Sequence, residues 1–493
     1  MTSKKILAIL IIVAMTALIF TSCDETDEDT QTTTAESSQQ KEDGGVALLP
    51  DLPEYDWERA TLRVLTENAG SAGSIDGVAV KSNEAWIPRD IAAEEETGDP
   101  INDAVYRRNR ALEEKYNFTV EQVFSTSDNI VTSVKRAVAA GDDYFDIVSV
   151  AIGSAGYLLA PAGCFVDLFN VNYLDFEKPW WDKNAIADIS IGKKLFFASG
   201  DFTLVTKDAT SAMLFNKKLL EDFGLESPYE LVRNNQWTIS KLTEMARNAT
   251  GDLDGDGTMY WETDRFGFTY STMMPMIHAF GERYVSKNEN DLPVLTMGSE
   301  RYYLASDAWR EFISSGVMGG PPYEMPGAAG LTDGERIFID NRALFMSSNI
   351  MSVEKLRGMD TDFGILPMPK LNEHQEKWGN SVVIFYAQVL AIPKFHDIDA
   401  LDRIGFMLEA VSAESRYTVM PAYYDIQLKG KFARDEESSE MLDIIFNSMI
   451  YDIGLIYGWI GNVNTSSASG LESSRDMIEA AMQKTVDAFA ALD

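Results

Sequence analysis

The sequence predicts an α/β protein whose mainly parallel sheets are covered by helices on both faces. Two observations lead to this fold class. Strand-like and helical segments alternate along the chain, and 45% of the 493 residues are apolar, which is enough to form real cores. Between residues 61 and 152 the order is strand, helix, strand, helix, strand, which is typical of a parallel sheet with crossover helices. Ligands of such sheets bind beyond the carboxyl ends of the strands.

In the N-terminal part, the first strand is expected at residues 61–68 and the first helix at 101–118. The helix should begin at Asn102 or Asp103, because both side chains favour the N-cap and apolar residues follow at helical spacing. The next segments are a strand at 118–124, a helix at 129–141 that ends at Gly141, and a strand at 145–152.

The same alternation resumes after residue 210. Residues 211–231 run from a strand into a helix that should stop near Gly224, and a helix within 237–251 is capped by Thr238 or Ser240. The later segments are strands at 341–349 and 362–369, a long strand at 381–393, and helices at 397–417 and 472–492.

The first residues resemble a bacterial lipoprotein signal. Lys4 and Lys5 precede an apolar run, Ile6 to Phe20, which is shorter than the roughly 20 residues of a spanning helix. The run ends in "IFTSC", which resembles a lipobox and implies removal of residues 1–22 and lipid attachment to Cys23. An ordinary cleaved signal is the alternative, and a transmembrane anchor is a weaker one. The lipid would place the protein on the extracellular face of the bacterial cytoplasmic membrane, in the periplasm if an outer membrane is present.

Residues 23–58 are expected to form a disordered tether between the lipid and a folded body. Most of the segment is rich in Thr, Ser, Gln and acidic residues, and it offers little apolar surface to bury. A chain of this composition cannot recover the entropy that ordering would cost.

The rest of the composition limits the function. The formal net charge is −35, which argues against nucleic acid as a partner. The chain is long enough for two or three domains. Its cysteines are Cys23 and Cys164, so lipidation of the first would leave no disulfide, and Cys164 is expected to be buried.

Eight phrases carry a resemblance to a known family. They are "NDAVYRRNRALEEKYNF", "DYFDIVSV", "GCFVDL", "KKLFFASGDF", "AMLFNKKLLEDFGL", "QWTISKLTEMAR", "RIFIDNRALFMSS" and "DFGILPMP". In this order, over nearly all of residues 59–493, they resemble the extracellular solute-binding proteins of ABC importers, in the large family that carries sugars. The resemblance implies a periplasmic-binding-protein-like fold, in which two discontinuous lobes joined by a hinge close on a ligand.

The resemblance also implies how the chain is divided between the lobes. The first crossing should fall just before residue 211 and the second within "QVLAIPK". The first lobe would then comprise residues 59–208 and 388–435, and the second lobe 209–387 and 436–493.

The expected function is capture of a carbohydrate, an oligosaccharide in particular, by a monomer that delivers it to ABC permease subunits. Another solute, such as a peptide or a cationic compound, is the alternative, because the strong acidity would steer cations. Catalysis is not expected: the three histidines share no motif, and neither a G-x-S-x-G elbow nor a P-loop occurs. A pair of carboxylates for glycoside hydrolysis stays open, as do the roles of a sensor partner and an adhesin.

By analogy with the family, the ligand is expected between the strand ends of the two lobes. Sugars need aromatic side chains for stacking and polar side chains for their hydroxyls. The candidate ligand-binding residues are Glu67, Asn68, Trp86 and Asp201 from the first lobe, Tyr270, Ser348 and Asn349 from the second, and Trp459 from a third crossing region. The family often has a Trp just after "FMSS"; here Asn349 and Ile350 stand there, so that stacking side chain is missing or supplied from elsewhere.

The run "GDLDGDG" predicts a calcium loop. Asp252, Asp254 and Asp256 match the alternate carboxylates of a helix–loop calcium site. Thr258 could add a backbone carbonyl, and Glu262 or Asp264 must supply the closing carboxylate, because the twelfth position holds Thr263. The alternative is a solvated Asp-Gly turn, since these residues also form turns. Relatives in the family carry structural calcium in a similar loop, which implies the same cofactor here.

Overall fold

The computed structural model describes residues 48–67, 72–75, 78–81, 88–125, 129–271, 276–320, 331–429, 436–461 and 468–492. The predicted signal at 1–22, Cys23, Asn68 and Trp86 lie outside these ranges, as does the part of the predicted tether before residue 48. Among the described residues, none of the helices combines the length and the apolar character needed to cross a membrane.

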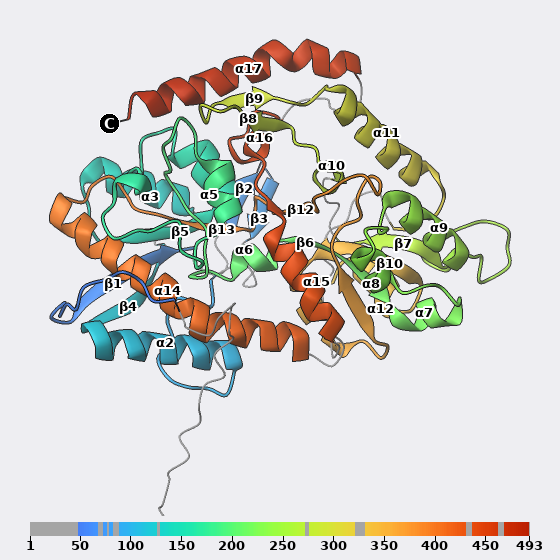
Figure 1. The fold of residues 1–493 in the computed structure, drawn as a ribbon, viewed down its shortest axis with the longest axis horizontal. Helices are drawn as coiled ribbons and strands as arrows, with labels where there is room; N and C mark the ends of the chain where they lie inside the picture. The colour runs from blue at the N-terminus through green and yellow to red at the C-terminus, as the bar shows by residue number, and fades with distance from the viewer. Residues whose placement is uncertain are drawn as a thin grey trace, which may run out of the picture. The chain divides into compact units, whose positions relative to one another are not determined.

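The first sheet has the strand order β13-β5-β1-β4 (Figure 1). Its strands are β1 (Ala60–Thr66), β4 (Phe118–Phe124), β5 (Ile147–Ala151) and β13 (Gln388–Ala391). β1 pairs in parallel with both β4 and β5, whereas β13 is antiparallel to β5. The predicted strand–helix–strand–helix–strand order is confirmed, with α2 (Pro100–Tyr116) and α3 (Ile130–Ala140) as the crossover helices.

The second sheet has the strand order β11-β6-β10-β7. Its strands are β6 (Ser211–Asn216), β7 (Phe266–Tyr270), β10 (Ala343–Asn349) and β11 (Phe363–Leu366). Only β10 and β7 are parallel, because β6 runs against both of its neighbours. The α/β class is confirmed, but "mainly parallel" is wrong for this sheet. β6 and β13 are the first strands after the chain crosses between the sheets, and each enters in the opposite direction.

The long strand expected at residues 381–393 is broken in the structure. It consists of β12 (Asn380–Ser381), a turn, and β13. The turn is fixed by backbone hydrogen bonds from Val383 N to Ala209 O at 3.0 Å and from Tyr386 N to Val383 O at 3.1 Å. The bond to Ala209 joins this crossing to the other one, which enters β6 through α6 (Val205–Asp208).

Capping side chains set where the helices begin. The predicted N-cap of α2 at Asn102 or Asp103 is wrong: Asp99 accepts from Ile101 N and Asn102 N, and Pro100 occupies the first turn, where its missing N–H costs nothing. Thr238 caps α9 (Ile239–Ala249), as one of the two predicted alternatives.

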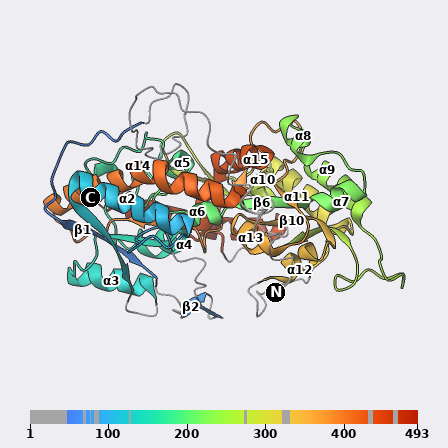
Figure 2. The same cartoon turned by 90° about the horizontal axis from the view of Figure 1, so that it is seen from below.

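Further helices complete the two lobes. Near the sheets lie α4 (Ile152–Ser154), α5 (Lys183–Ile189), α7 (Lys217–Asp222), α8 (Pro228–Arg233), α12 (Asp333–Ile339) and α13 (Met351–Lys355). α14 (Ile398–Lys429) packs along α2, and α15 (Glu436–Asn447) contacts β11 (Figures 1 and 2). The remaining elements are α10 (Met276–Ala279), β8 (Val285–Lys287), β9 (Pro293–Leu295), α11 (Glu300–Ser314), β14 (Met449–Ile450), α16 (Ile453–Ile456) and α17 (Ala468–Ala490), besides the short hairpin β2 (Ala72–Ile75) and β3 (Val78–Lys81).

The last part of the predicted tether contacts the folded body through Trp57. Trp57 donates its backbone N–H to Tyr116 O at 3.0 Å, and its ring centroid lies 5.3 Å from that of Phe406. Trp57 supplies the apolar surface that the preceding polar segment lacks, and burying it offsets the entropy of ordering.

Candidate functional site

The loop that follows β5 presents aromatic surface at the carboxyl end of the first sheet. α4 continues into a π-helical turn, Ala155–Leu159, where the Tyr157 side chain is 60% exposed while its neighbours Gly156 and Leu159 are buried. Gly458 lies against the Tyr157 ring: a Cβ at Gly458 would be 2.7 Å from it. Gly458 also has a φ of +70°, so both its conformation and this contact favour glycine.

The second crossing brings another exposed aromatic residue to the same loop. Ile152 N donates to Ala387 O at 2.8 Å, and Gly153 N donates to Ile384 O at 3.0 Å. Phe385, between these two acceptors, is 57% exposed. Sequence reasoning missed Tyr157 and Phe385; the available signal was an aromatic residue in the loop after the predicted strand at 145–152 and another within the predicted strand at 381–393.

Glu67 follows the carboxyl end of β1, as expected. It is half-buried, and burial raises the pKa of its carboxyl group. A carboxyl group in this environment holds its proton more readily than one in water.

Tyr270, Ser348 and Asn349 are brought together at one end of the second sheet. The register pairs Ser347 with Tyr270, so the neighbouring Ser348 and Asn349 lie at the same end. All three predicted residues are buried. The Ser348 hydroxyl donates to Ser352 Oγ at 2.6 Å, and the Ser352 hydroxyl donates to Glu335 Oε1 at 2.7 Å. The Ser348 hydroxyl therefore donates to a partner within the second lobe in this arrangement.

Asp201 and Trp459 also form hydrogen bonds to other side chains of the protein. Asp201 is 4% exposed, and its two oxygens receive Lys207 Nζ at 3.0 Å and an Arg416 guanidinium N–H at 3.1 Å. Trp459 is buried, stacks on Tyr457 with ring centroids 5.2 Å apart, and donates its indole N–H to Thr485 Oγ1 at 3.0 Å.

Arg89 connects the two lobes. Its guanidinium lies 3.0 Å from Glu354 on α13 and 3.7 Å from Asp208 in the first crossing. Asp208 also accepts the hydroxyl of Tyr423 at 2.9 Å. Burial raises the pKa of Asp208 to about 7, although Arg89 and Tyr423 act in the opposite direction.

A buried Ser–His–Asp chain lies where the second lobe meets the crossings. His278 Nδ1 is 2.7 Å from Ser381 Oγ, and His278 Nε2 is 3.0 Å from Asp452 Oδ2. The same Asp452 oxygen accepts from Tyr284 N at 2.7 Å. A nucleophilic serine must be reachable by substrate, and Ser381 is 3% exposed. The chain therefore fits a structural junction between α10, β12 and the segment after β14.

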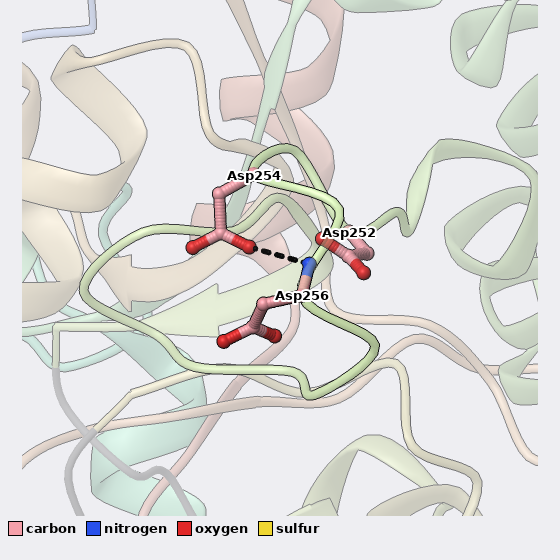
Figure 3. Close-up of side chains that lie close together, drawn as sticks. All are labelled: Asp252, Asp254 and Asp256. Atoms are coloured by element: carbon pink, nitrogen blue, oxygen red, sulfur yellow. Dashed lines mark hydrogen bonds between the residues drawn. The ribbon is translucent and has the colours of Figure 1, made fainter.

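The predicted calcium loop gathers three of its carboxylates. One oxygen from each of Asp252, Asp254 and Asp256 lies within 4.8 Å of the others, and all three side chains are exposed (Figure 3). Backbone N–H groups of the loop also donate to these carboxylates, for example Gly257 N to Asp252 at 2.8 Å. The donor set, three hard oxygens on alternate residues, suits Ca²⁺.

The other predicted metal ligands are placed differently. Asp264 is buried and closes the loop from inside: its two oxygens accept from Leu253 N and Tyr260 N, both at 2.8 Å. These bonds lower the pKa of Asp264. Thr258 and Glu262 are exposed.

Comparison with solved structures shows the fold. The galacto-N-biose/lacto-N-biose I-binding protein of the ABC transporter from Bifidobacterium longum, in complex with lacto-N-biose, is 11% identical; the match covers 89% of this chain and 98% of that one, with a TM-score of 0.53. UspC from M. tuberculosis is 13% identical over 85% and 100% of the two chains, with a TM-score of 0.52. A cyclo/maltodextrin-binding protein complexed with maltotetraose is 12% identical over 88% and 97%, with a TM-score of 0.50. At these identities the likeness establishes a shared two-lobed fold.

A family model matches part of the chain. No curated protein sequence matches this chain. Residues 92–320 match the family described as "Bacterial extracellular solute-binding protein". This family consists of binding proteins, in agreement with the expectation that the chain does not catalyse a reaction. Together with the shared fold, this match over residues 92–320 agrees with the resemblance found in the sequence.

Proposed function

We propose that the protein captures an oligosaccharide between its two lobes and delivers it to the permease subunits of an ABC importer. The family match supports solute binding outside the cell. Two proteins of the same fold were solved with lacto-N-biose and with maltotetraose, which favours a carbohydrate as the solute. The protein acts as a monomer in this proposal, since a single chain provides both lobes.

Exposed aromatic surface at the carboxyl end of the first sheet is the observation that carries the proposal. Tyr157 and Phe385 are 60% and 57% exposed, and backbone hydrogen bonds hold their two segments side by side. More than half of the surface of each ring-bearing residue is therefore accessible at this strand end. Exposed rings suit stacking against the C–H faces of sugar rings, while polar groups nearby would bind hydroxyls.

The test is binding of a glycan panel, measured by titration calorimetry and intrinsic tryptophan fluorescence. We expect at least one oligosaccharide to bind, and Tyr157→Ala to weaken that binding at least about tenfold, because burying an aromatic ring contributes about 1.5–3 kcal/mol. Tyr260→Ala is the matched control, since Tyr260 is 51% exposed on the calcium loop. Equal loss in both variants would argue against stacking on Tyr157.

A peptide or a cationic solute is the second candidate, which the net charge of −35 favours. Binding of peptides or polyamines, with no response to any glycan, would replace the oligosaccharide in the proposal. Release of monosaccharide from a glycan would contradict the assignment to binding alone.

Two further features belong to the same proposal. Lipid attachment at Cys23 would hold the protein on the extracellular face of the cytoplasmic membrane, and the acidic residues that follow would leave the body free to reach its permease. Calcium bound by Asp252, Asp254 and Asp256 would neutralise three neighbouring carboxylates and fix the loop between α9 and β7. The convergence of the three carboxylates supports this metal role.

A further inference from the structure

The hairpin formed by β8 and β9 leaves the second lobe and returns to it. It lies between α10 and α11, after β7 in the chain. Beyond α11 the chain rejoins the second sheet beside β7, where Phe268 N donates to Val317 O at 3.0 Å and Gly319 N donates to Phe268 O at 2.9 Å. The chain therefore lies in the second lobe both before and after the hairpin.

The tip of this hairpin binds the first lobe through one residue, Asp291. Its carbonyl oxygen accepts from Gly192 N at 2.9 Å. Its carboxylate accepts from the Ser190 hydroxyl at 3.0 Å and from Lys193 N at 2.8 Å. Lys287, from the hairpin itself, donates to the same carboxylate. Asp291 thus binds the 190–193 turn through both its backbone and its side chain.

Two further contacts lie beside the hydrogen bonds of Asp291. Arg283, at the start of the hairpin, forms an ion pair of 2.8 Å with Asp188 on α5, and Lys287 Nζ donates to Ser190 O at 2.9 Å. Figure 1 shows the hairpin beside α5, in agreement with these contacts. Charge-assisted hydrogen bonds of this kind are among the stronger polar contacts in proteins.

The receiving turn is part of the first lobe. Ala198, just after it, exchanges backbone hydrogen bonds of 2.9 Å with Leu390 of β13, and Leu168 N donates to Leu195 O at 2.7 Å. At the contact itself, Lys193 and Asp291 both have a φ of 63°, a left-handed conformation that non-glycine residues adopt at a cost. Because these two residues face each other across the contact, the hydrogen bond from Lys193 N to Asp291 and the neighbouring hydrogen bonds offset that cost in the joined arrangement.

The charged groups of this contact remain partly accessible to water. The side chains of Arg283, Asp188, Lys287 and Asp291 keep between 15% and 29% of their surface exposed. A cavity of about 210 Å³ lies beside them, lined by Asp188, Arg283, Val285, Ser286, Lys287, Tyr451 and Ile453. Water can therefore hydrogen-bond to these polar groups when they separate, which lowers the free-energy cost of breaking the contact.

We propose that the β8–β9 hairpin is a clasp between the lobes, centred on Asp291, that holds them in the arrangement seen here and must release before they separate. The consequence for ligand uptake rests on the proposed function: a weaker clasp would shift the ligand-free protein toward open lobes and speed ligand release. The clasp itself requires no ligand, because all of its groups belong to this chain.

The experiment measures the distance between the lobes by spin-label spectroscopy on the ligand-free full-length chain. Labels are attached at Ala139→Cys on α3 and Glu221→Cys on α7, which are exposed positions of the first and second lobe. Cys164 is buried, and Cys23→Ser keeps the N-terminal segment unlabelled. Asp291→Ala is compared with Glu289→Ala, which removes the same charge from an exposed neighbour in the same hairpin.

We expect Asp291→Ala to raise the ratio of open to closed lobes by about tenfold, while Glu289→Ala leaves the distance distribution unchanged. Arg283→Gln, which removes only the pair with Asp188, should shift the distribution in the same direction by less. An unchanged distribution in a folded Asp291→Ala variant would overturn the clasp, because the hairpin would then move with the first lobe. Absence of glycan binding would refute the proposed function and leave this measurement unaffected.

Discussion

Glu409 Oε2 accepts the indole N–H of Trp181 at 2.9 Å. The other oxygen of this carboxylate accepts the indole N–H of Trp180 at 3.0 Å, so one side chain of α14 holds two adjacent tryptophans of the first lobe. Both tryptophans are buried in the hydrophobic core. Burial raises the pKa of Glu409 to about 7, and the two indole donors counteract only part of this effect.

The first prediction is that the tryptophan fluorescence titrates near pH 7. Deprotonation of Glu409 places a charge beside two indole rings, and their emission should change in the range where the carboxyl group titrates. Glu409→Gln should abolish this component, because its amide does not ionise in this range. A fluorescence titration of both forms provides the measurement. A transition near pH 7 of equal size in the variant would contradict the assignment to Glu409.

The same group predicts the direction of a pH effect on stability. The pKa of Glu409 in the folded chain lies above its ordinary value of 4.5, so folding favours the protonated form. This contribution is fully present below about pH 4.5 and is lost as the pH rises through about 7. Asp208, whose pKa is also raised to about 7, acts in the same direction. Melting temperatures should therefore fall between about pH 5 and about pH 8, and less steeply in Glu409→Gln.

The second prediction concerns the contact between β7 and α9. A Cβ at Gly267 would lie 2.0 Å from Ala246 O, a backbone atom that cannot move without shifting the helix. Gly267→Ala should therefore destabilise the protein by about 1–3 kcal/mol, as overpacking of a core does. Gly358→Ala is the matched control, because a Cβ there would meet no atom within 4 Å. Urea unfolding of the two variants tests this difference, and equal midpoints would contradict it.

The sequence predicted elements whose signals are local. Apolar spacing and capping residues located α3 with its end at Gly141, and α9 with Thr238 as its N-cap. The break between β12 and β13 was missed, because "VVIFYA" has the composition of a strand and the turn depends on a distant partner, Ala209. Local pattern alone does not carry that information.

The candidate site was predictable only to the level of segments. The ligand was expected between the strand ends of the two lobes, and the loop after β5 lies at such an end, but the exposure of Tyr157 and Phe385 follows from tertiary packing. Trp459 was a reasonable aromatic candidate, yet it stacks on Tyr457 and donates to Thr485 of α17. Which aromatic residues remain exposed depends on such long-range contacts.

The third prediction tests the lipid anchor. The lipobox-like "IFTSC" implies that Cys23 receives the lipid, so Cys23→Ala should release the protein from membranes into the medium or the periplasm. Fractionation of cells, followed by detection of the protein, measures this change. Cys164→Ala is the control, because Cys164 is buried in the folded body and should leave the membrane fraction unchanged. Retention of Cys23→Ala on the membrane would favour an anchor through the apolar run itself.

The last prediction is that calcium stabilises the protein through the loop at Asp252, Asp254 and Asp256. The three carboxylates lie close enough to repel one another, and a bound cation would remove that repulsion. Chelation should lower the melting temperature, and calcium at about 100 times its Kd should restore about 2–3 kcal/mol. Asp252→Asn should remove the response, because its two oxygens hold the N–H groups of Gly255 and Gly257 and also belong to the carboxylate cluster.

A second variant separates metal binding from loop structure. Asp254→Asn keeps an oxygen that can accept from Asp256 N, so the turn should persist while the charge available to calcium falls. In scanning calorimetry this variant should melt like the chelated parent protein and respond less to added calcium. If the parent protein melts at the same temperature with and without chelator, the loop is a hydrogen-bonded Asp-Gly turn that Asp264 helps to close by accepting from Leu253 N and Tyr260 N.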